Sequence, residues 1–238
     1  MAGPQLVWDL ARATGFLAYL LLTASVLLGL VLSLKWRSSG WPRFISSELH
    51  EYLGLLSLLA LGAHTLAIAL DPFMGFTLAE LAVPMASHYR PLWLAPGILG
   101  TYLVVGVWYS KRLRSRIGYS WWHRLHLMTF AAFVLSTVHG LGMGSDSRTA
   151  WAGLIYAGAA VMVISLTAAR LLTPTPPEPA HPWVALAGAL LALWTLSWAV
   201  AGPLRPGWAL IANSGHGSGA RTSSPVQVAS PTPGTGLP

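Results

Sequence analysis

Four histidines are the residues of this chain whose type and spacing best suggest chemistry. His50 and His64 are fourteen residues apart, and His126 and His139 are thirteen apart, each pair at the two ends of a long apolar stretch. At 1.5 Å per residue, both spacings correspond to a rise of about 20 Å along a helix. If the two helices run parallel, His50 meets His126 at one depth and His64 meets His139 at the other. The sequence therefore predicts two levels of paired imidazoles.

Two neutral imidazoles from facing helices are suitable axial ligands for a heme iron, and the interior of a helical bundle can hold the porphyrin. Ligation by two histidines leaves no open position on the iron, which favours electron transfer. We therefore expect a heme at each level, with His50 and His126 at the inner level and His64 and His139 at the outer level. The residues alone leave open a single heme, or no heme and histidines that only hydrogen-bond across the bundle.

Two arginines are candidates to pair with the propionates of the inner heme. Arg124 lies two residues before His126, and Arg43 lies seven residues before His50. A guanidinium can form charge-assisted hydrogen bonds with a carboxylate. Both positions also suit a second role, because basic residues beside membrane spans set the orientation of the chain.

The direction of the two imidazoles on the second of these helices is harder to reconcile with pairing than their depth. At about 100° per residue, His50 and His64 share one face, whereas His126 and His139 point about 140° apart on a straight helix. Ser136 and Thr137 could bend this helix by hydrogen-bonding back to carbonyl groups.

The composition indicates a membrane protein. Of the 238 residues, 54% are hydrophobic and only 9% are charged, against about 25% charged residues in a soluble domain. The net charge of +7 comes from basic residues in short segments between apolar runs, which argues against a nucleic-acid-binding surface. The chain has no cysteine, so disulfides, thiolate metal sites and iron–sulfur clusters are excluded.

Six apolar stretches are long enough to cross a hydrocarbon layer of about 30 Å, which requires roughly 20 helical residues. We expect the second and fourth to extend toward their N-terminal sides, with Ser47 and Ser120 as helix caps, so that the histidines lie inside helices. The expected fold is an all-α, integral-membrane six-helix bundle with the hemes between its parallel second and fourth helices. The six stretches cover residues 13–34, 52–70, 91–110, 125–145, 149–169 and 182–204.

The distribution of basic residues predicts the orientation. Nine of them follow the first, third and fifth predicted helices and therefore lie on one side of the membrane, which the positive-inside rule assigns to the cytoplasm. We accordingly expect a multi-pass protein of the plasma or inner membrane with both termini extracytoplasmic. The nine residues are Lys35, Arg37, Arg43, Lys111, Arg112, Arg114, Arg116, Arg124 and Arg170.

Two short runs resemble a known family. The first is Ser-Glu-Leu-His-Glu-Tyr-Leu-Gly at 47–54, followed by His64, and the second is Trp-His-Arg-Leu-His at 122–126, followed by His139. Together they resemble the ferric reductase-like transmembrane domain, found in NADPH oxidases, ferric reductases and the heme subunit of the bacterial methionine sulfoxide reductase system. The resemblance covers about residues 10–172 and implies two stacked b-type hemes on these histidine pairs.

The resemblance ends at about residue 172, which suggests that the chain has three regions. Residues 1–172 form the expected five-helix heme-binding domain, residues 173–204 a Pro-rich connector and a sixth transmembrane helix, and residues 205–238 a disordered extracytoplasmic tail rich in Gly, Ser, Pro and Thr. Oxidases and ferric reductases continue from the fifth helix into a flavin and nicotinamide module. This chain contains no Gly-rich dinucleotide fingerprint, so we expect no FAD or NAD(P) site in it.

The expected function is to carry single electrons across the membrane, as the electron-transfer subunit of an oxidoreductase. The donor is a separate cytoplasmic flavoprotein or a membrane quinol, and the acceptor is extracytoplasmic: ferric iron, oxygen or a redox partner protein. The competing hypothesis is a non-redox transporter, or an assembly or scaffold subunit, with structural histidines. No carboxylate lies in the central part of any predicted span, which counts against proton-coupled transport.

Overall fold

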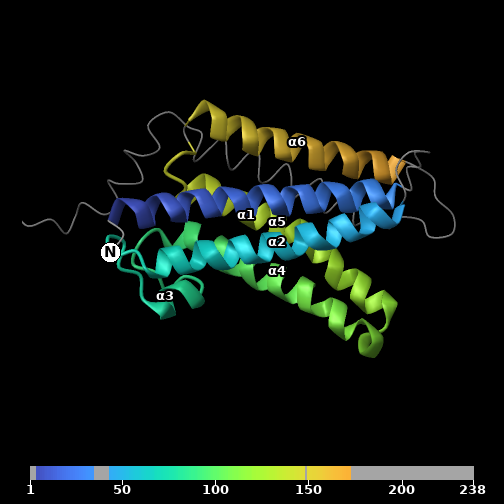
Figure 1. Cartoon of the computed structure of the whole chain (residues 1–238), viewed down its shortest axis with the longest axis horizontal. Helices are drawn as coiled ribbons and strands as arrows, with labels where there is room; N and C mark the ends of the chain where they lie inside the picture. Colours follow the sequence, from blue (N-terminus) through green and yellow to red (C-terminus); the bar gives the residue numbers. More distant parts are fainter. Residues whose placement is uncertain (1–3, 35–42, 148, 173–238) are drawn as a thin grey trace, which may run out of the picture. The chain divides into compact units, whose positions relative to one another are not determined.

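The computed structural model describes residues 4–34, 43–147 and 149–172, and within these ranges the chain is helical with no strand (Figure 1). The expected sixth span at 182–204, the connector before it and the tail after it lie outside the described residues. The helices are α1 (Pro4–Ser33), α2 (Arg43–Ala69), α3 (Leu78–Ala82), α4 (Pro91–Ile117), α5 (Tyr119–Met143) and α6 (Ala150–Leu172).

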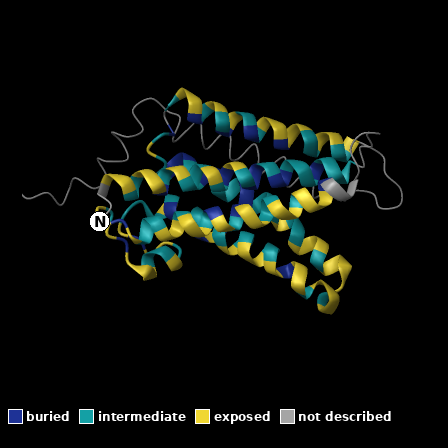
Figure 2. Ribbon diagram, in the orientation of Figure 1, coloured by how far each residue is buried: buried dark blue, intermediate teal, exposed yellow. Residues whose placement is uncertain are grey.

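Five of these helices are long and apolar enough to cross a membrane: α1, α2, α4, α5 and α6. Many of their large apolar side chains are exposed (Figure 2), among them Leu59 at 60% and Leu66 at 59%. In water such a surface would be unfavourable, whereas in lipid it needs no cover. The first five predicted spans are therefore confirmed as helices of a multi-pass membrane protein.

The helix boundaries differ from the predicted ones in physically understandable ways. α1 begins at Pro4 and includes Asp9 and Arg12, whose side chains form an ion pair at 3.2 Å across one helical turn. The predicted caps are wrong, because α2 starts at Arg43 with Ser47 inside it and α5 starts at Tyr119. The predicted N-terminal extensions are correct, and His50 and His126 both lie within helices.

A single residue, Gly118, separates α4 from α5. Its backbone has φ 79° and ψ 164°, a region open almost only to glycine. Its N–H donates to the carbonyl of Arg114 at 3.0 Å, and its carbonyl accepts from the N–H of Trp122 at 3.1 Å. One residue thus ends α4 and begins α5, which forms a tight helical hairpin.

The helices pack mainly as two pairs. α1 lies along α2, α4 lies along α5, and α1 also contacts α5 and α6. Between α1, α5 and α6 the core is aromatic: the ring of Tyr19 lies 5.9 Å from that of Phe133 and 4.9 Å from that of Tyr156. In contrast, α2 and α5, which carry the four histidines, do not pack closely against each other.

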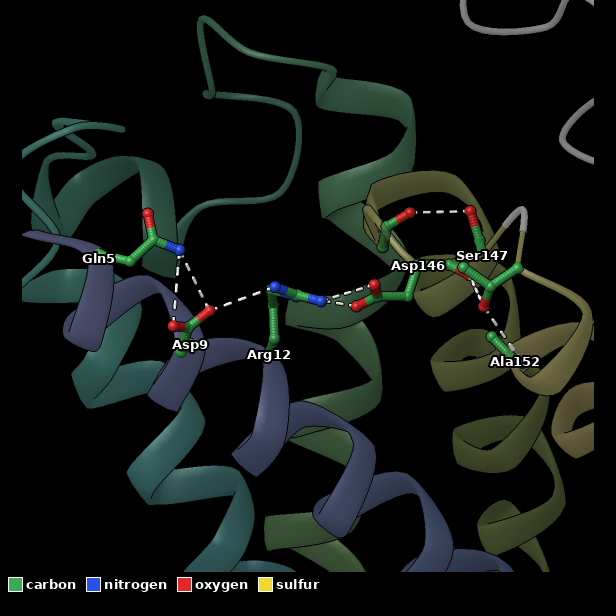
Figure 3. Close-up of polar contacts among 8 residues, drawn as sticks. Gln5, Asp9, Arg12, Asp146, Ser147 and Ala152 are labelled. Carbon is green, nitrogen blue, oxygen red and sulfur yellow. Dashed lines mark hydrogen bonds and ion pairs between the residues drawn. The ribbon is translucent and has the colours of Figure 1, made fainter.

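An ion pair links the start of α1 to the loop between α5 and α6 (Figure 3). The Arg12 guanidinium donates through Nε to Asp146 Oδ2 at 2.8 Å and through Nη2 to Asp146 Oδ1 at 2.6 Å. The Asp146 side chain is only 14% exposed. This two-point geometry fixes the relative position of the two segments more firmly than a single contact can.

We predict that Asp146→Asn destabilises the protein by about 1–2 kcal/mol, because the amide loses the charge and one acceptor of the paired contact. The measurement is the thermal unfolding midpoint in detergent. Asp9→Asn is the matched control, since Asp9 contacts the same guanidinium at 3.2 Å from an exposed position. Equal midpoints for the two variants would contradict this account of the loop.

Candidate functional site

The structure brings the four histidines together as two facing pairs. The ring centroids of His50 and His126 are 5.8 Å apart, and those of His64 and His139 are 6.3 Å apart. In both pairs the ring planes are inclined at 76°. No hydrogen bond joins the two rings of either pair, although all four residues are described. The rings therefore face each other without bonding to each other.

The difference in direction along α5 does not keep either ring from its partner. α5 is helical from Tyr119 to Met143, and His126 and His139 both reach histidines of α2. Of the two expected backbone contacts, Thr137 forms one: its hydroxyl donates to the carbonyl of Phe133 at 2.9 Å. The pairing thus arises from the way α2 and α5 lie relative to each other. A helical wheel of one helix cannot predict this arrangement.

Three of the four rings are held by the same kind of hydrogen bond. Nδ1 of His50 lies 2.9 Å from the carbonyl oxygen of Ser25 on α1, and Nδ1 of His64 lies 2.8 Å from that of Ala11. Nδ1 of His139 lies 3.0 Å from the carbonyl oxygen of Trp93 on α4. Because a carbonyl only accepts, the hydrogen must be on Nδ1, and Nε2 keeps its lone pair free for a metal.

Beside each of these carbonyls the neighbouring helix has a glycine four residues further on. A Cβ at Gly15 would lie 3.0 Å from the His64 ring, at Gly29 3.1 Å from the His50 ring, and at Gly97 2.5 Å from the His139 ring. The ring therefore lies against the bare backbone, where it can reach a carbonyl that already accepts from residue i+4. We call the glycine against which each ring lies its glycine seat: Gly29 for His50, Gly15 for His64 and Gly97 for His139.

Sequence reasoning missed these glycines, although a signal was present. Gly15 and Gly29 are fourteen residues apart, the same interval as His50 and His64. In two antiparallel neighbouring helices, equal intervals keep both contacts in register. Matching the glycine spacing of one span to the histidine spacing of the next would have predicted the contact between α1 and α2.

His126 is held differently from the other three histidines. The described residues provide no carbonyl for its Nδ1; instead its ring stacks on that of Trp122, with centroids 5.2 Å apart and planes inclined at 21°. The pair formed with His50 therefore has one ring anchored by a hydrogen bond and one positioned by an indole.

Two further residues near His126 in the sequence, Arg124 and His123, are exposed and lie against other aromatic rings. Arg124 is exposed, and its guanidinium carbon lies 5.0 Å from the centroid of the Trp121 ring. Arg43 is the first residue of α2, and its side chain lies outside what the structure describes. His123 is exposed and stacks on Tyr119, with ring centroids 5.8 Å apart.

The loop between α2 and α4 carries the short helix α3 and is fixed by Glu80. Hydrogen bonds from the backbone N–H groups of Thr77 and His88 lower the pKa of Glu80 to about 2, so this carboxylate remains ionised at physiological pH. Arg90 then leads into α4 with φ 44° and donates through Nη1 to the carbonyl of Gly142 at 3.1 Å. This contact ties the start of α4, which bears the Trp93 carbonyl, to the end of α5.

The donor set suits axial ligation of a metal that is otherwise bound. Metal–imidazole bonds are about 2.0–2.1 Å long, so rings on opposite sides of one ion have centroids about 6 Å apart, close to the separations in both pairs. Among the described residues no group of three or more His, Cys, Asp or Glu could hold a metal ion, and two protein ligands alone are too few for a structural zinc site. A heme, which supplies four nitrogens of its own, fits this donor set.

Comparison with known proteins adds no relative: no family model, curated protein or solved structure matches the chain. What the site can do must therefore be argued from its own residues.

We predict that Gly97→Ala destabilises the protein by about 1–3 kcal/mol, because the new methyl group displaces the His139 ring. Gly106→Ala is the control on the same helix, since a Cβ there meets nothing within 4 Å, and alanine favours a helix over glycine. Thermal unfolding in detergent measures both effects. If Gly97→Ala were as stable as Gly106→Ala, the ring would not lie against the Gly97 backbone.

Proposed function

We propose that this protein is a transmembrane di-heme b cytochrome that moves single electrons across the membrane. One heme is held by His50 and His126 and the other by His64 and His139. The observation that carries this proposal is the presence of two pairs of facing imidazoles at two depths. Their ring centroids are 5.8 Å apart in one pair and 6.3 Å apart in the other, and no hydrogen bond joins the two rings of either pair. The proposal includes membership of the ferric reductase-like family, on the evidence of the same histidines.

The histidine anchors support ligation over a structural role. A histidine that merely tied the α1–α2 pair of helices to the α4–α5 pair would bond to a group on the facing pair. Here Nδ1 of His50, His64 and His139 bonds to the neighbour within the same helical hairpin, and Nε2 is left for the group between the hairpins. A carbonyl partner also fixes the ring orientation and raises the basicity of Nε2.

A bound heme supplies one-electron chemistry between its ferric and ferrous states. The contribution of the chain is to bind, orient and exclude water. The two imidazoles of each pair would hold the iron of a bound heme and would leave no free position for oxygen at the metal. The apolar helices hold the two sites about 20 Å apart along α2, as the spacing of His50 and His64 requires.

The direction of transfer follows from the basic residues at the end of the bundle near His50 and His126. With this end in the cytoplasm, electrons from a flavoprotein or a quinol enter at the first pair and leave at the second. The acceptor is extracytoplasmic and is ferric iron, oxygen or a redox partner protein. In this proposal the chain serves as the membrane subunit of an oxidoreductase.

The experiment is a reduced-minus-oxidised spectrum of the purified protein together with a heme-to-protein ratio. We predict the spectrum of b-type heme at two hemes per chain. His64→Ala and His139→Ala each lose one of the two, because the remaining imidazole cannot hold the iron alone with the same affinity. His50→Ala and His126→Ala each lose the other.

His123→Ala is the matched control for these variants. It lies three residues from His126 on the same helix, is exposed, and should retain both hemes. Purified protein without a heme spectrum would refute the proposal and favour a transporter or scaffold role. A loss of heme in His123→Ala equal to that in His126→Ala would show that the ligands are wrongly assigned.

A further inference from the structure

One buried polar atom near the His50–His126 pair has no partner among residues 4–34, 43–147 and 149–172. The indole Nε1 of Trp122 is buried and forms no hydrogen bond with any residue that the structure describes. An indole N–H is a donor only, and leaving such a donor buried and unpaired costs about 1–3 kcal/mol. The position therefore calls for an acceptor that the described residues do not supply.

The surroundings of Trp122 indicate what kind of acceptor this is. The Trp122 ring stacks on that of His126, and the guanidinium carbon of Arg114 lies 4.7 Å from its centroid. Among the described residues Arg114 has no carboxylate within ion-pair distance. An N–H donor and a cation, neither of them paired with another described residue, thus meet at the same ring, which favours an anionic oxygen.

We propose that Trp122 Nε1 donates a hydrogen bond to a propionate carboxylate of the heme on His50 and His126, with Arg114 as the cation that balances its charge. This inference rests on the proposed function. A b-type heme carries two propionates, and a carboxylate taken out of water needs donors. Trp122 already touches the axial ligand His126, so its N–H lies next to the group that this ligand holds.

The assignment differs from the one that the sequence suggested. Arg124 is closer to His126 along the chain, but its guanidinium lies at the exposed ring of Trp121. Arg114 comes from the end of α4, and the one-residue turn at Gly118 brings it back against Trp122. The cation beside the buried N–H is therefore on the neighbouring helix, twelve residues before His126.

The charge balance gives the direction of the effect. A propionate bears a negative charge that stabilises the ferric heme, and a donor or cation beside it weakens this influence. Removal of the Trp122 N–H should therefore lower the midpoint potential of the heme on His50 and His126 and leave the other midpoint unchanged. Removal of the Arg114 charge should lower the same midpoint.

The experiment is an optical redox titration of the purified two-heme protein and its variants. Trp122→Phe keeps an aromatic ring on His126 but removes the N–H, and Trp121→Phe is the control one residue away at an exposed position. Arg114→Gln is compared with Arg116→Gln, which removes an equal charge from the same end of α4. We expect Trp122→Phe and Arg114→Gln to lower one midpoint, and the two controls to leave both unchanged.

A double variant separates a shared carboxylate from two independent effects. If Trp122 and Arg114 act on one propionate, Trp122→Phe with Arg114→Gln shifts the midpoint by an amount that differs from the sum of the single shifts. Should Trp122→Phe bind less heme, Arg114→Gln still tests the charge, because it leaves the Trp122 ring on His126 in place.

Three results would overturn the inference. Midpoints of Trp122→Phe equal to those of Trp121→Phe would exclude the hydrogen bond while leaving the two-heme proposal intact. If Trp122→Phe left both midpoints unchanged but needed a higher quinol concentration for its reduction, the acceptor of the Trp122 N–H would be a quinol instead. Wild-type protein without heme would refute the proposed function itself, and this inference with it.

Discussion

The hydrogen bond from an imidazole Nδ1 to a backbone carbonyl of the neighbouring helix is the interaction on which the site depends. It is formed by His50, His64 and His139, and each time it requires a glycine that lets the ring reach the backbone. An exposed helix carbonyl already accepts one bond along the helix, so the second bond is available only where no side chain covers it. Small residues at these points are therefore a condition of the histidine orientation.

This arrangement also explains how the helices divide their tasks. α1 and α4 provide the carbonyls that orient three of the four facing rings, those of His50 and His64 on α2 and of His139 on α5. Each of the two helices that carry the histidines thus has its own supporting helix, packed along it as a hairpin partner. The helices that carry the imidazoles remain apart and face each other mainly through the rings.

Much of the fold was predictable from the sequence, because long uncharged stretches can be satisfied in lipid only as helices. The depths at which the histidines pair were also predictable, because the position of a residue along a helix follows from its number alone. Helix ends were less predictable: Asp9 and Arg12 stay within α1 because they neutralise each other. The glycine seats depend on which helices are neighbours, and the role proposed for Trp122 depends on a buried N–H that no spacing reveals.

Each facing pair takes one imidazole from the α1–α2 hairpin and the other from the α4–α5 hairpin. Any group bound between the rings therefore joins the two halves of the molecule, and its binding energy adds to the stability of the assembled bundle. The two hairpins can form separately during membrane insertion, each complete in its own backbone hydrogen bonds. Contacts of α1 with α5 and α6 already join the two hairpins, so under the proposed function cofactor supply would strengthen their union and raise the share of newly made polypeptide that matures.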